Sequence, residues 1–112
     1  MSTNKALVLI DGSNVYFAQK IIGKQLDWVK VLDYFRKSNT LINIKYYAGV
    51  RKGNSSADGF FKKLRKINIQ VITKEVKTVM DGKGGTYEKC NFDVEIAVDA
   101  VNAKDKYDTL IL

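Results

Sequence analysis

The sequence predicts an α/β protein whose central parallel sheet is covered by helices on both faces. Short apolar segments, several of them rich in β-branched and aromatic residues, alternate with segments whose apolar residues recur at helical spacing. Alternation of this kind gives right-handed crossovers and therefore parallel strands. A chain of 112 residues has the size of one ordinary domain. We therefore expect residues 1–112 to form a single domain.

The first strand is predicted at residues 5–10, KALVLI, because this run is short, apolar and closed by the polar turn DGSN. Residues 14–22 then predict a short helix that ends near Gly23. In parallel α/β sheets the first strand is usually central, and ligands collect at the carboxyl ends of the strands. Asp11, which follows the first strand directly, is thus placed where a ligand would bind.

The middle of the chain predicts two helices and two strands. A second helix is expected from Asp27, a suitable N-cap, and a third from residue 56 to residue 67. Strands are expected at residues 41–50, LINIKYYAGV, and at residues 68–73, NIQVIT. The apolar stripes of the two helices consist of Trp28, Val31, Leu32 and Phe35, and of Phe60, Phe61, Leu64 and Ile67.

Residues 74–90 combine glycines and lysines without a helical period, which predicts a long loop or a ragged hairpin. The GKGG segment at 82–85 favours a flexible turn over a phosphate cradle, because no Lys-Ser/Thr follows it and it opens no helix. Asn91 is expected to cap a last helix, and residues 107–112, YDTLIL, to form a fourth strand. The predicted buried stripe of the last helix is Val94, Ala97, Val98 and Val101.

Composition narrows the chemistry. The chain has 19 Lys and Arg against 12 Asp and Glu, a net charge of +7 that favours a polyanionic partner. With no His and one Cys, it offers neither a Cys/His zinc set nor an internal disulfide, so any metal would have to be held by oxygen. Neither a membrane span nor a signal peptide is evident, which predicts a cytoplasmic protein without a membrane partner.

Two acidic clusters point to a site. The DGSN turn is explained by turn formation alone, but KCNFDVEIAVDA, residues 89–100, adds carboxylates within an otherwise apolar helix. The helix dipole stabilises Asp93 in the first turn, whereas Asp99 lies in the interior and needs a partner, water or a metal. The two are separated by about 9 Å along the axis and about 120° around it. Asp93 is therefore the expected partner of Asp11, and Asp99 is expected to orient Lys89 or a backbone amide.

Carboxylates without His or Cys suit hard cations such as magnesium, which takes one or two of them and keeps several waters. Such an ion can activate a water for attack on phosphorus and offset charge on the leaving oxygen. Asp11 and Asp93 are thus the candidate catalytic residues of a phosphodiester hydrolase. The basic residues expected to hold the phosphate backbone are Arg51, Lys52, Lys74, Lys77, Lys83 and Lys89.

Four segments resemble the NYN domain, the LabA-like (DUF88) branch of the PIN-like nuclease superfamily. They are LVLIDGSNVY, YYAGV, KCNFDVEIAVDA and YDTLIL, and together they extend over essentially the whole chain. The resemblance implies a three-layer PIN-like (Rossmannoid) fold and endoribonuclease activity that depends on Mg2+ or Mn2+. Asp11 and the helix residues Asp93 and Asp99 match the family's metal-binding aspartates, and Asn14, with Ser13 beside it, matches the turn that orients the site.

The chain also departs from this family pattern. Cys90 stands where the family usually has glycine, and the family strand matching YDTLIL continues into an acidic S-G-D-x-D-F motif, whereas this sequence ends at Leu112. We therefore expect a domain that lacks its C-terminal part, with RNA, single-stranded or structured, as its partner. The edge left at Leu110 and Leu112 would favour pairing with another chain, including a homodimer.

Two alternatives stay open at this point. A non-catalytic nucleic-acid-binding module of the same fold fits the basic residues and the missing motif, with Tyr46, Tyr47 and Tyr87 as stacking candidates, although strand alternation predicts that Tyr46 or Tyr47 is core. A phosphoacceptor or dinucleotide-binding domain is disfavoured. Position 13 is Ser where the former needs a second Asp, and no G-x-G-x-x-G follows the first strand.

Overall fold

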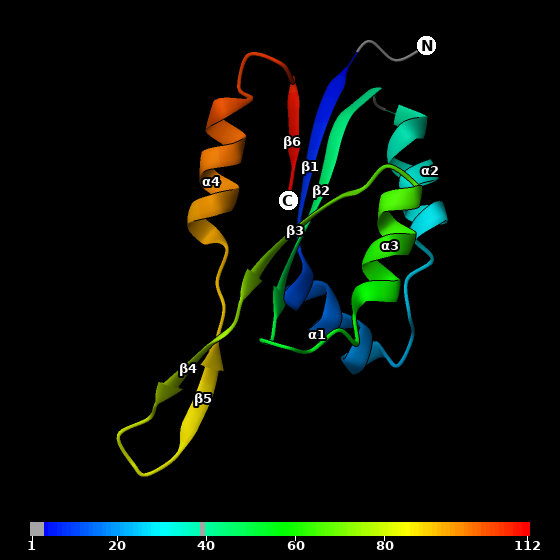
Figure 1. Cartoon of the computed structure of the whole chain (residues 1–112). Helices are drawn as coiled ribbons and strands as arrows, with labels where there is room; N and C mark the ends of the chain where they lie inside the picture. Colours follow the sequence, from blue (N-terminus) through cyan, green and yellow to red (C-terminus); the bar gives the residue numbers. More distant parts are fainter. Residues whose placement is uncertain (1–3, 39) are drawn as a thin grey trace.

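The computed structural model describes residues 4–38 and 40–112 (Figure 1). Its main sheet has four parallel strands in the order β3-β2-β1-β6, and β4 and β5 form a separate antiparallel pair. The elements are β1 (Lys5–Asp11), α1 (Gly12–Ile22), α2 (Trp28–Ser38), β2 (Thr40–Val50), α3 (Asp58–Lys66), β3 (Gln70–Glu75), β4 (Lys77–Met80), β5 (Thr86–Lys89), α4 (Asp93–Asn102) and β6 (Thr109–Ile111). The predicted parallel α/β class is confirmed.

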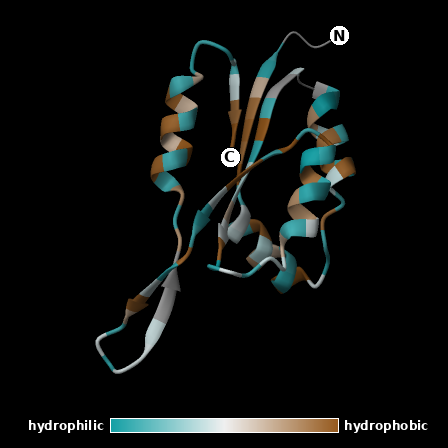
Figure 2. Ribbon diagram, in the orientation of Figure 1, coloured by the Kyte–Doolittle hydropathy of each residue, from teal (hydrophilic) through white to brown (hydrophobic). Residues whose placement is uncertain are grey.

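The sheet has a hydrophobic core on each face. One contains Val8, Ile44 and Tyr46, packed against residues of α2 and α3, and the other contains Leu7, Leu9, Tyr47 and Phe92, packed against α4. Figure 1 shows α2 and α3 on one side of the sheet and α4 on the other, with α1 at the carboxyl ends of the strands. The central strand β1 is correspondingly apolar in Figure 2. This three-layer arrangement is compatible with the PIN-like fold.

The caps predicted for the first two helices are present. Gly23 ends α1 with a φ of 75° and donates its N–H to the Gln19 carbonyl, a left-handed conformation that suits glycine. The Asp27 Oδ1 accepts from the backbone N–H groups of Val29 and Lys30 at 3.1 and 3.3 Å and so caps α2. The end of α1 and the start of α2 were therefore predicted correctly from their capping residues.

Strand β3 begins two residues later than the predicted 68–73 and runs over Gln70–Glu75. The backbone N–H groups of Asn68 and Ile69 donate to the carbonyls of Arg65 and Leu64, and Asn68 adopts a φ of 68°. These residues complete the end of α3 and satisfy its last carbonyls, so they are not available to start the strand. The shift brings Lys74 into the sheet.

Most of the segment 74–90, predicted as a long loop or a ragged hairpin, forms a hairpin over residues 77–89, while Lys74 and Glu75 end β3. Strands β4 and β5 pair antiparallel, and the hairpin projects from the body of the molecule (Figure 1). In the turn, Asp81 Oδ1 accepts from the N–H groups of Lys83 and Gly85 at 2.7 and 3.0 Å, while Gly82 and Gly84 adopt φ of 78° and 83°. Turn geometry thus explains the glycines, as the GKGG pattern predicted.

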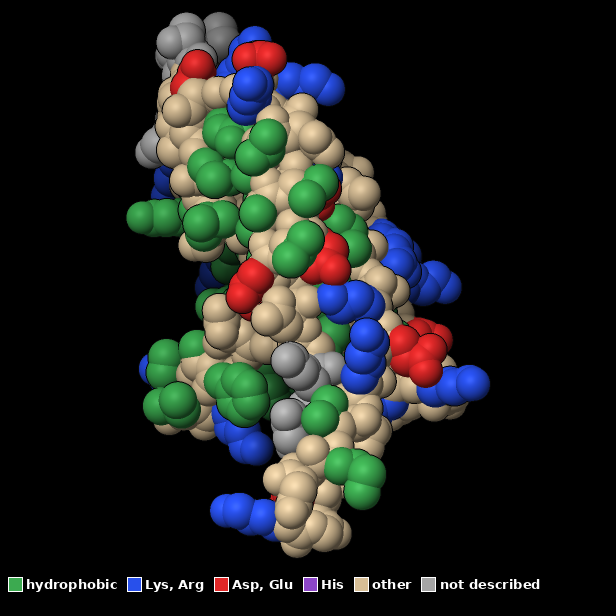
Figure 3. Space-filling model, turned by 90° about the vertical axis from the view of Figure 1, so that its left-hand side faces the viewer, with side chains coloured by type: hydrophobic (Ala, Val, Ile, Leu, Met, Phe, Trp, Pro, Cys, Tyr) green, Lys and Arg blue, Asp and Glu red, His purple; other side chains and the backbone are tan. Residues whose placement is uncertain are grey.

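The predicted buried stripe of the last helix is wrong. Val94, Val98 and Val101 are 71%, 49% and 64% exposed, and hydrophobic side chains gather over this helix in Figure 3. The helix instead turns Phe92, Ile96, Ala100 and Ala103 toward the sheet. Both stripes are apolar and have helical spacing, and the one that packs is flanked by Glu95 and Asp99, which meet polar groups on the strands.

No helix within the described ranges is both long enough and apolar enough to cross a membrane.

Candidate active site

Asp11 ends β1 and caps α1. Its Oδ1 accepts the backbone N–H of Ser13 at 3.0 Å, and its own backbone is extended, with φ −77° and ψ 109°. The side chain is half-buried, whereas Ser13 and Asn14 are exposed. Burial raises the pKa of Tyr46 above its usual value, and the negative charge of Asp11 adds to this shift. Asp11 thus has both the turn role and the edge position that the sequence predicted.

Gly12 allows this turn to form directly against β2. A Cβ atom there would lie 2.5 Å from the Tyr47 carbonyl oxygen and 2.8 Å from two ring atoms of Tyr46. Such distances are well inside van der Waals contact, and one of the contacted groups is backbone. The glycine after Asp11 is therefore required by close packing.

Replacing Gly12 with Ala is expected to lower the free energy of unfolding by about 1–3 kcal/mol, because the new methyl group overpacks the junction of α1 and β2. Gly59→Ala is the matched control, since Gly59 lies in α3 with nothing within 4 Å of an added Cβ. Chemical denaturation of both variants tests this. Equal stability of the two variants would contradict the close approach at Gly12.

Strand alternation predicted that Tyr46 or Tyr47 is core, and both are buried, at 6% and 0% exposure, so neither can stack on a base. Both faces of β2 are covered, because residues of α2 and α3 pack on the side of Tyr46 and residues of α4 pack on the side of Tyr47. Tyr46 meets Trp28 with ring centroids 5.4 Å apart, while Tyr47 meets Phe92 at 5.5 Å. The third stacking candidate, Tyr87, has a side chain outside the described part.

Asp99 finds its partners on β2. Its Oδ2 accepts from the Tyr47 hydroxyl at 2.5 Å and lies 3.7 Å from Lys45 Nζ. Burial raises the pKa of Tyr47 well above its usual value, and the hydrogen bond to Asp99 adds to this shift. Asp99 therefore has partners, as its position inside the helix required. These partners are Tyr47 and Lys45, whereas Lys89 or a backbone amide was expected. The side chain of Lys89, its expected partner, is not among those described.

A second carboxylate, Glu95, lies on the same face of α4; it belongs to the acidic cluster seen in the sequence but was given no role there. Lys74 Nζ donates to Glu95 Oε1 at 2.8 Å, and this hydrogen bond lowers the pKa of Glu95. The other oxygen, Oε2, is buried and has no hydrogen-bond partner in the described structure. The i, i+4 spacing of Glu95 and Asp99 was the signal that could have found it.

Asp93 opens α4 with an exposed side chain. Its backbone N–H donates to Asn91 Oδ1 at 2.9 Å, but the N-cap of α4 is Phe92, which makes no side-chain cap hydrogen bond. The cap predicted at Asn91 is therefore one residue too early, because the first helical hydrogen bond runs from the Ile96 N–H to the Phe92 carbonyl. The Asp93 carboxylate makes no hydrogen bond or ion pair with any described residue.

The first turn of α4 and Asp11 lie on the same face of the sheet. Strand alternation places Asp11 on the face of Leu7 and Leu9, which is the face that α4 covers. Asp11 is also the register partner of Tyr47, on which Phe92 packs. The helix turn that carries Asp93 thus begins on the face, and near the end of the strand, where Asp11 lies.

The donor chemistry fits a weakly held hard cation. Asp11 and Asp93 offer oxygen ligands, and magnesium typically takes one or two protein carboxylates together with waters. No group of three or more His, Cys, Asp or Glu residues that could hold a metal occurs within the described ranges. A site built on these residues would therefore be a two-carboxylate site with most positions filled by water.

The predicted basic residues divide between two segments that follow strand ends. Arg51 and Lys52 are exposed in the loop after β2, and Lys77 and Lys83 are exposed on the hairpin. Lys74 differs, because its amine already contacts Glu95 and the Asn91 carbonyl. The side chain of Lys89 lies outside the described set.

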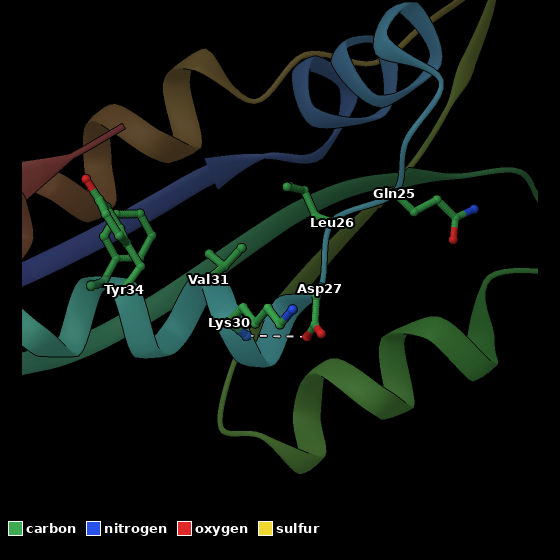
Figure 4. Close-up of a pocket in the computed structure, with 7 residues that line it drawn as sticks. Gln25, Leu26, Asp27, Lys30, Val31 and Tyr34 are labelled. Carbon is green, nitrogen blue, oxygen red and sulfur yellow. Dashed lines mark hydrogen bonds between the residues drawn. The ribbon is translucent and has the colours of Figure 1, made fainter.

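A shallow apolar groove of about 420 Å³ lies elsewhere (Figure 4). It is formed by the start of α2 and the segment before it, on the side of the sheet opposite α4. Its lining residues are Gln25, Leu26, Asp27, Lys30, Val31, Tyr34 and Phe35. None of the predicted site residues lies in it, so the groove is separate from the candidate active site.

Comparison with known protein families shows to which family the chain belongs. The model of the NYN domain matches residues 5–112. The chain belongs to the NYN domain family. This family has a nuclease-like fold, which is the fold that the sequence segments and the layered sheet indicated.

Two known proteins are similar to this NYN domain. The chain is 32% identical to the low amplitude and bright protein LabA of Synechococcus elongatus over 113 residues, covering 97% of this chain and 60% of LabA. A crystal structure of a protein of unknown function from Vibrio parahaemolyticus superposes with a TM-score of 0.76 at 22% identity, covering 96% of this chain and 64% of that one. The chain thus spans less than two thirds of either protein.

Proposed function

We propose that this NYN domain hydrolyses RNA phosphodiester bonds with a magnesium or manganese ion held by Asp11 and Asp93. The observation that carries the proposal is the placement of Asp11 at the carboxyl end of the central strand, on the face where the first turn of α4 begins. Ligands of parallel α/β sheets bind at this end. Membership in a family with a nuclease-like fold supports the same reaction class.

The residues of the site would divide the work. The Ser13 N–H fixes one oxygen of Asp11, which leaves the other for the ion, and Asn14 lies one residue further along α1. When bound, the ion supplies an activated water and offsets charge on the leaving oxygen. The lysines and arginine of the β2 loop and the hairpin, Arg51, Lys52, Lys77 and Lys83, would hold the RNA backbone through its phosphates.

A second candidate function is RNA binding by the same fold without turnover. It is favoured by one observation, namely that the described residues provide no cluster of three acidic ligands. In-line hydrolysis benefits from further ligands that fix both the ion and the attacking water. The two candidates share the basic surface and differ only in whether bound RNA is cleaved.

Removal of the metal separates these candidates. We expect labelled single-stranded RNA to be cleaved with magnesium or manganese, to survive when a chelator is in excess, and to be cleaved again when the metal is restored, because both carboxylates act through the ion. Affinity for RNA measured in the chelator should be largely retained. Binding without cleavage under every metal condition would support the non-catalytic alternative, and chelator-resistant cleavage would contradict the proposal.

A further inference from the structure

Lys74 holds α4 against the sheet through three contacts. From β3, its Nζ donates to the Asn91 carbonyl at 2.5 Å and to Glu95 Oε1 at 2.8 Å, and it lies 4.8 Å from the centroid of the Phe92 ring. The distance to the ring is within the range of a cation–π interaction. One amine thus contacts Asn91, which precedes the N-cap of α4, the N-cap residue Phe92, and Glu95 in the first turn.

Two of these contacts are with the residues that come directly before Asp93. Asn91, whose carbonyl accepts from Lys74, also accepts the Asp93 N–H through its side-chain Oδ1. Phe92, the next residue, is 2% exposed and packs on Tyr47, the register partner of Asp11. The position of the Asp93 backbone relative to β1 therefore depends on Asn91 and Phe92, two of the three residues that Lys74 contacts.

Glu95 restricts the orientation of the first turn of α4 through its contact with Lys74. Its Oε1 accepts from Lys74, while Oε2 is buried without a hydrogen-bond partner among the described residues. Without Lys74, Glu95 Oε1 would lose its hydrogen-bond donor while Oε2 stayed buried, and turning the carboxylate fully toward solvent would rotate or fray the first turn of α4. The pair therefore favours one orientation of this turn.

We propose that Lys74 is a positioning residue that fixes the first turn of α4, and with it the Asp93 carboxylate, for the ion shared with Asp11. This inference rests on the proposed metal site. It differs from the sequence-based prediction that Lys74 binds RNA phosphates, because the amine is engaged within the protein. Residues that orient metal ligands from behind commonly change metal affinity or activity by about 10- to 100-fold when they are replaced.

The test compares Lys74→Met, Lys74→Arg and Glu95→Gln with Lys62→Met, a control at an exposed lysine of α3. Three quantities are measured well below the unfolding temperature. They are the Mn2+ affinity, from the free Mn2+ signal in electron paramagnetic resonance, the hydrogen-exchange rates of the Asp93 and Val94 amides without metal or RNA, and the RNA affinity in chelator.

We expect Lys74→Met and Glu95→Gln each to weaken Mn2+ binding about tenfold or more and to accelerate exchange of these two amides, with RNA affinity nearly unchanged. Lys74→Arg should keep most of the Mn2+ affinity, and Lys62→Met should match the wild type. A protein that carries both Lys74→Met and Glu95→Gln should bind Mn2+ no more weakly than either single variant.

The outcomes separate this inference from the proposed function. A wild type that binds Mn2+ together with a Lys74→Met variant that has unchanged Mn2+ affinity and amide exchange would overturn the positioning role and leave the metal site intact. A weakened RNA affinity with unchanged exchange would assign Lys74 to RNA instead. If the wild type binds no Mn2+, the proposed function fails, and the role of Lys74 in fixing the turn is then decided by the exchange rates alone.

Discussion

The Asp11→Asn variant is expected to lose metal-dependent RNA cleavage by about 100-fold or more, which corresponds to about 3 kcal/mol in the activation free energy. The physical reason is specific to charge. Asparagine is a good N-cap and keeps an oxygen for the Ser13 N–H, so α1 should still begin at Gly12. What is removed is the negative charge that would hold a hard cation.

The matched control is Asp58→Asn, because Asp58 is an exposed aspartate in the first turn of α3, on the opposite side of the sheet from α4. Rates are compared at saturating metal with circular dichroism to show that both variants are folded. Full activity of Asp11→Asn would contradict its role, and an equal loss in Asp58→Asn would show that the effect is not local to the site.

The Phe92→Ala variant is expected to lower the free energy of unfolding by about 3–5 kcal/mol, the usual cost of truncating a buried aromatic residue. Phe92 is 2% exposed, packs on Tyr47 with ring centroids 5.5 Å apart and lies beneath the Lys74 amine. Its removal leaves a cavity where α4 meets the sheet. Urea denaturation followed by tryptophan fluorescence measures the loss.

Val94→Ala is the control for Phe92→Ala. This side chain is 71% exposed on the outer face of α4, so its truncation should change the free energy of unfolding by no more than about 0.5 kcal/mol. A large loss in Val94→Ala with little effect in Phe92→Ala would mean that the helix presents its valine stripe to the sheet, as the sequence pattern had predicted.

The sequence was sufficient for the order and type of most elements because their signals are local. The apolar run before Asp11, the Asp27 cap and the glycine at position 23 each act within a few residues, and each is confirmed. The rotation of α4 could not be obtained in this way. Both apolar stripes of α4 have helical spacing, so the sequence pattern does not show which of them packs on the sheet. The stripe that packs is determined by contacts of Asp99 and Glu95 with Lys45, Tyr47 and Lys74, which β2 and β3 bring to that face.

In the candidate site, too, some features could be predicted from local sequence and others depend on contacts with distant strands. Asp11, Asp93 and Asp99 could be singled out because a carboxylate is unusual at the end of an apolar strand or inside an apolar helix. The pairing of Lys74 with Glu95 could not be predicted, since it depends on where β3 begins. The strand starts two residues later than expected, because Asn68 and Ile69 finish α3, and this places Lys74 within it, opposite Gly49. A lysine expected in a loop is thereby directed at α4.

The shared metal site is tested most directly by adding Mn2+ to the isotopically labelled protein and recording which backbone amide signals broaden. We expect the amides of residues 12–14 and residues 93–95 to broaden together, at the same Mn2+ concentration, because one ion would lie between the Asp11 and Asp93 carboxylates. Magnesium in excess should restore both sets of signals. Broadening of one segment without the other, or at clearly different Mn2+ concentrations, would show that the two carboxylates do not share an ion and would contradict the proposed site.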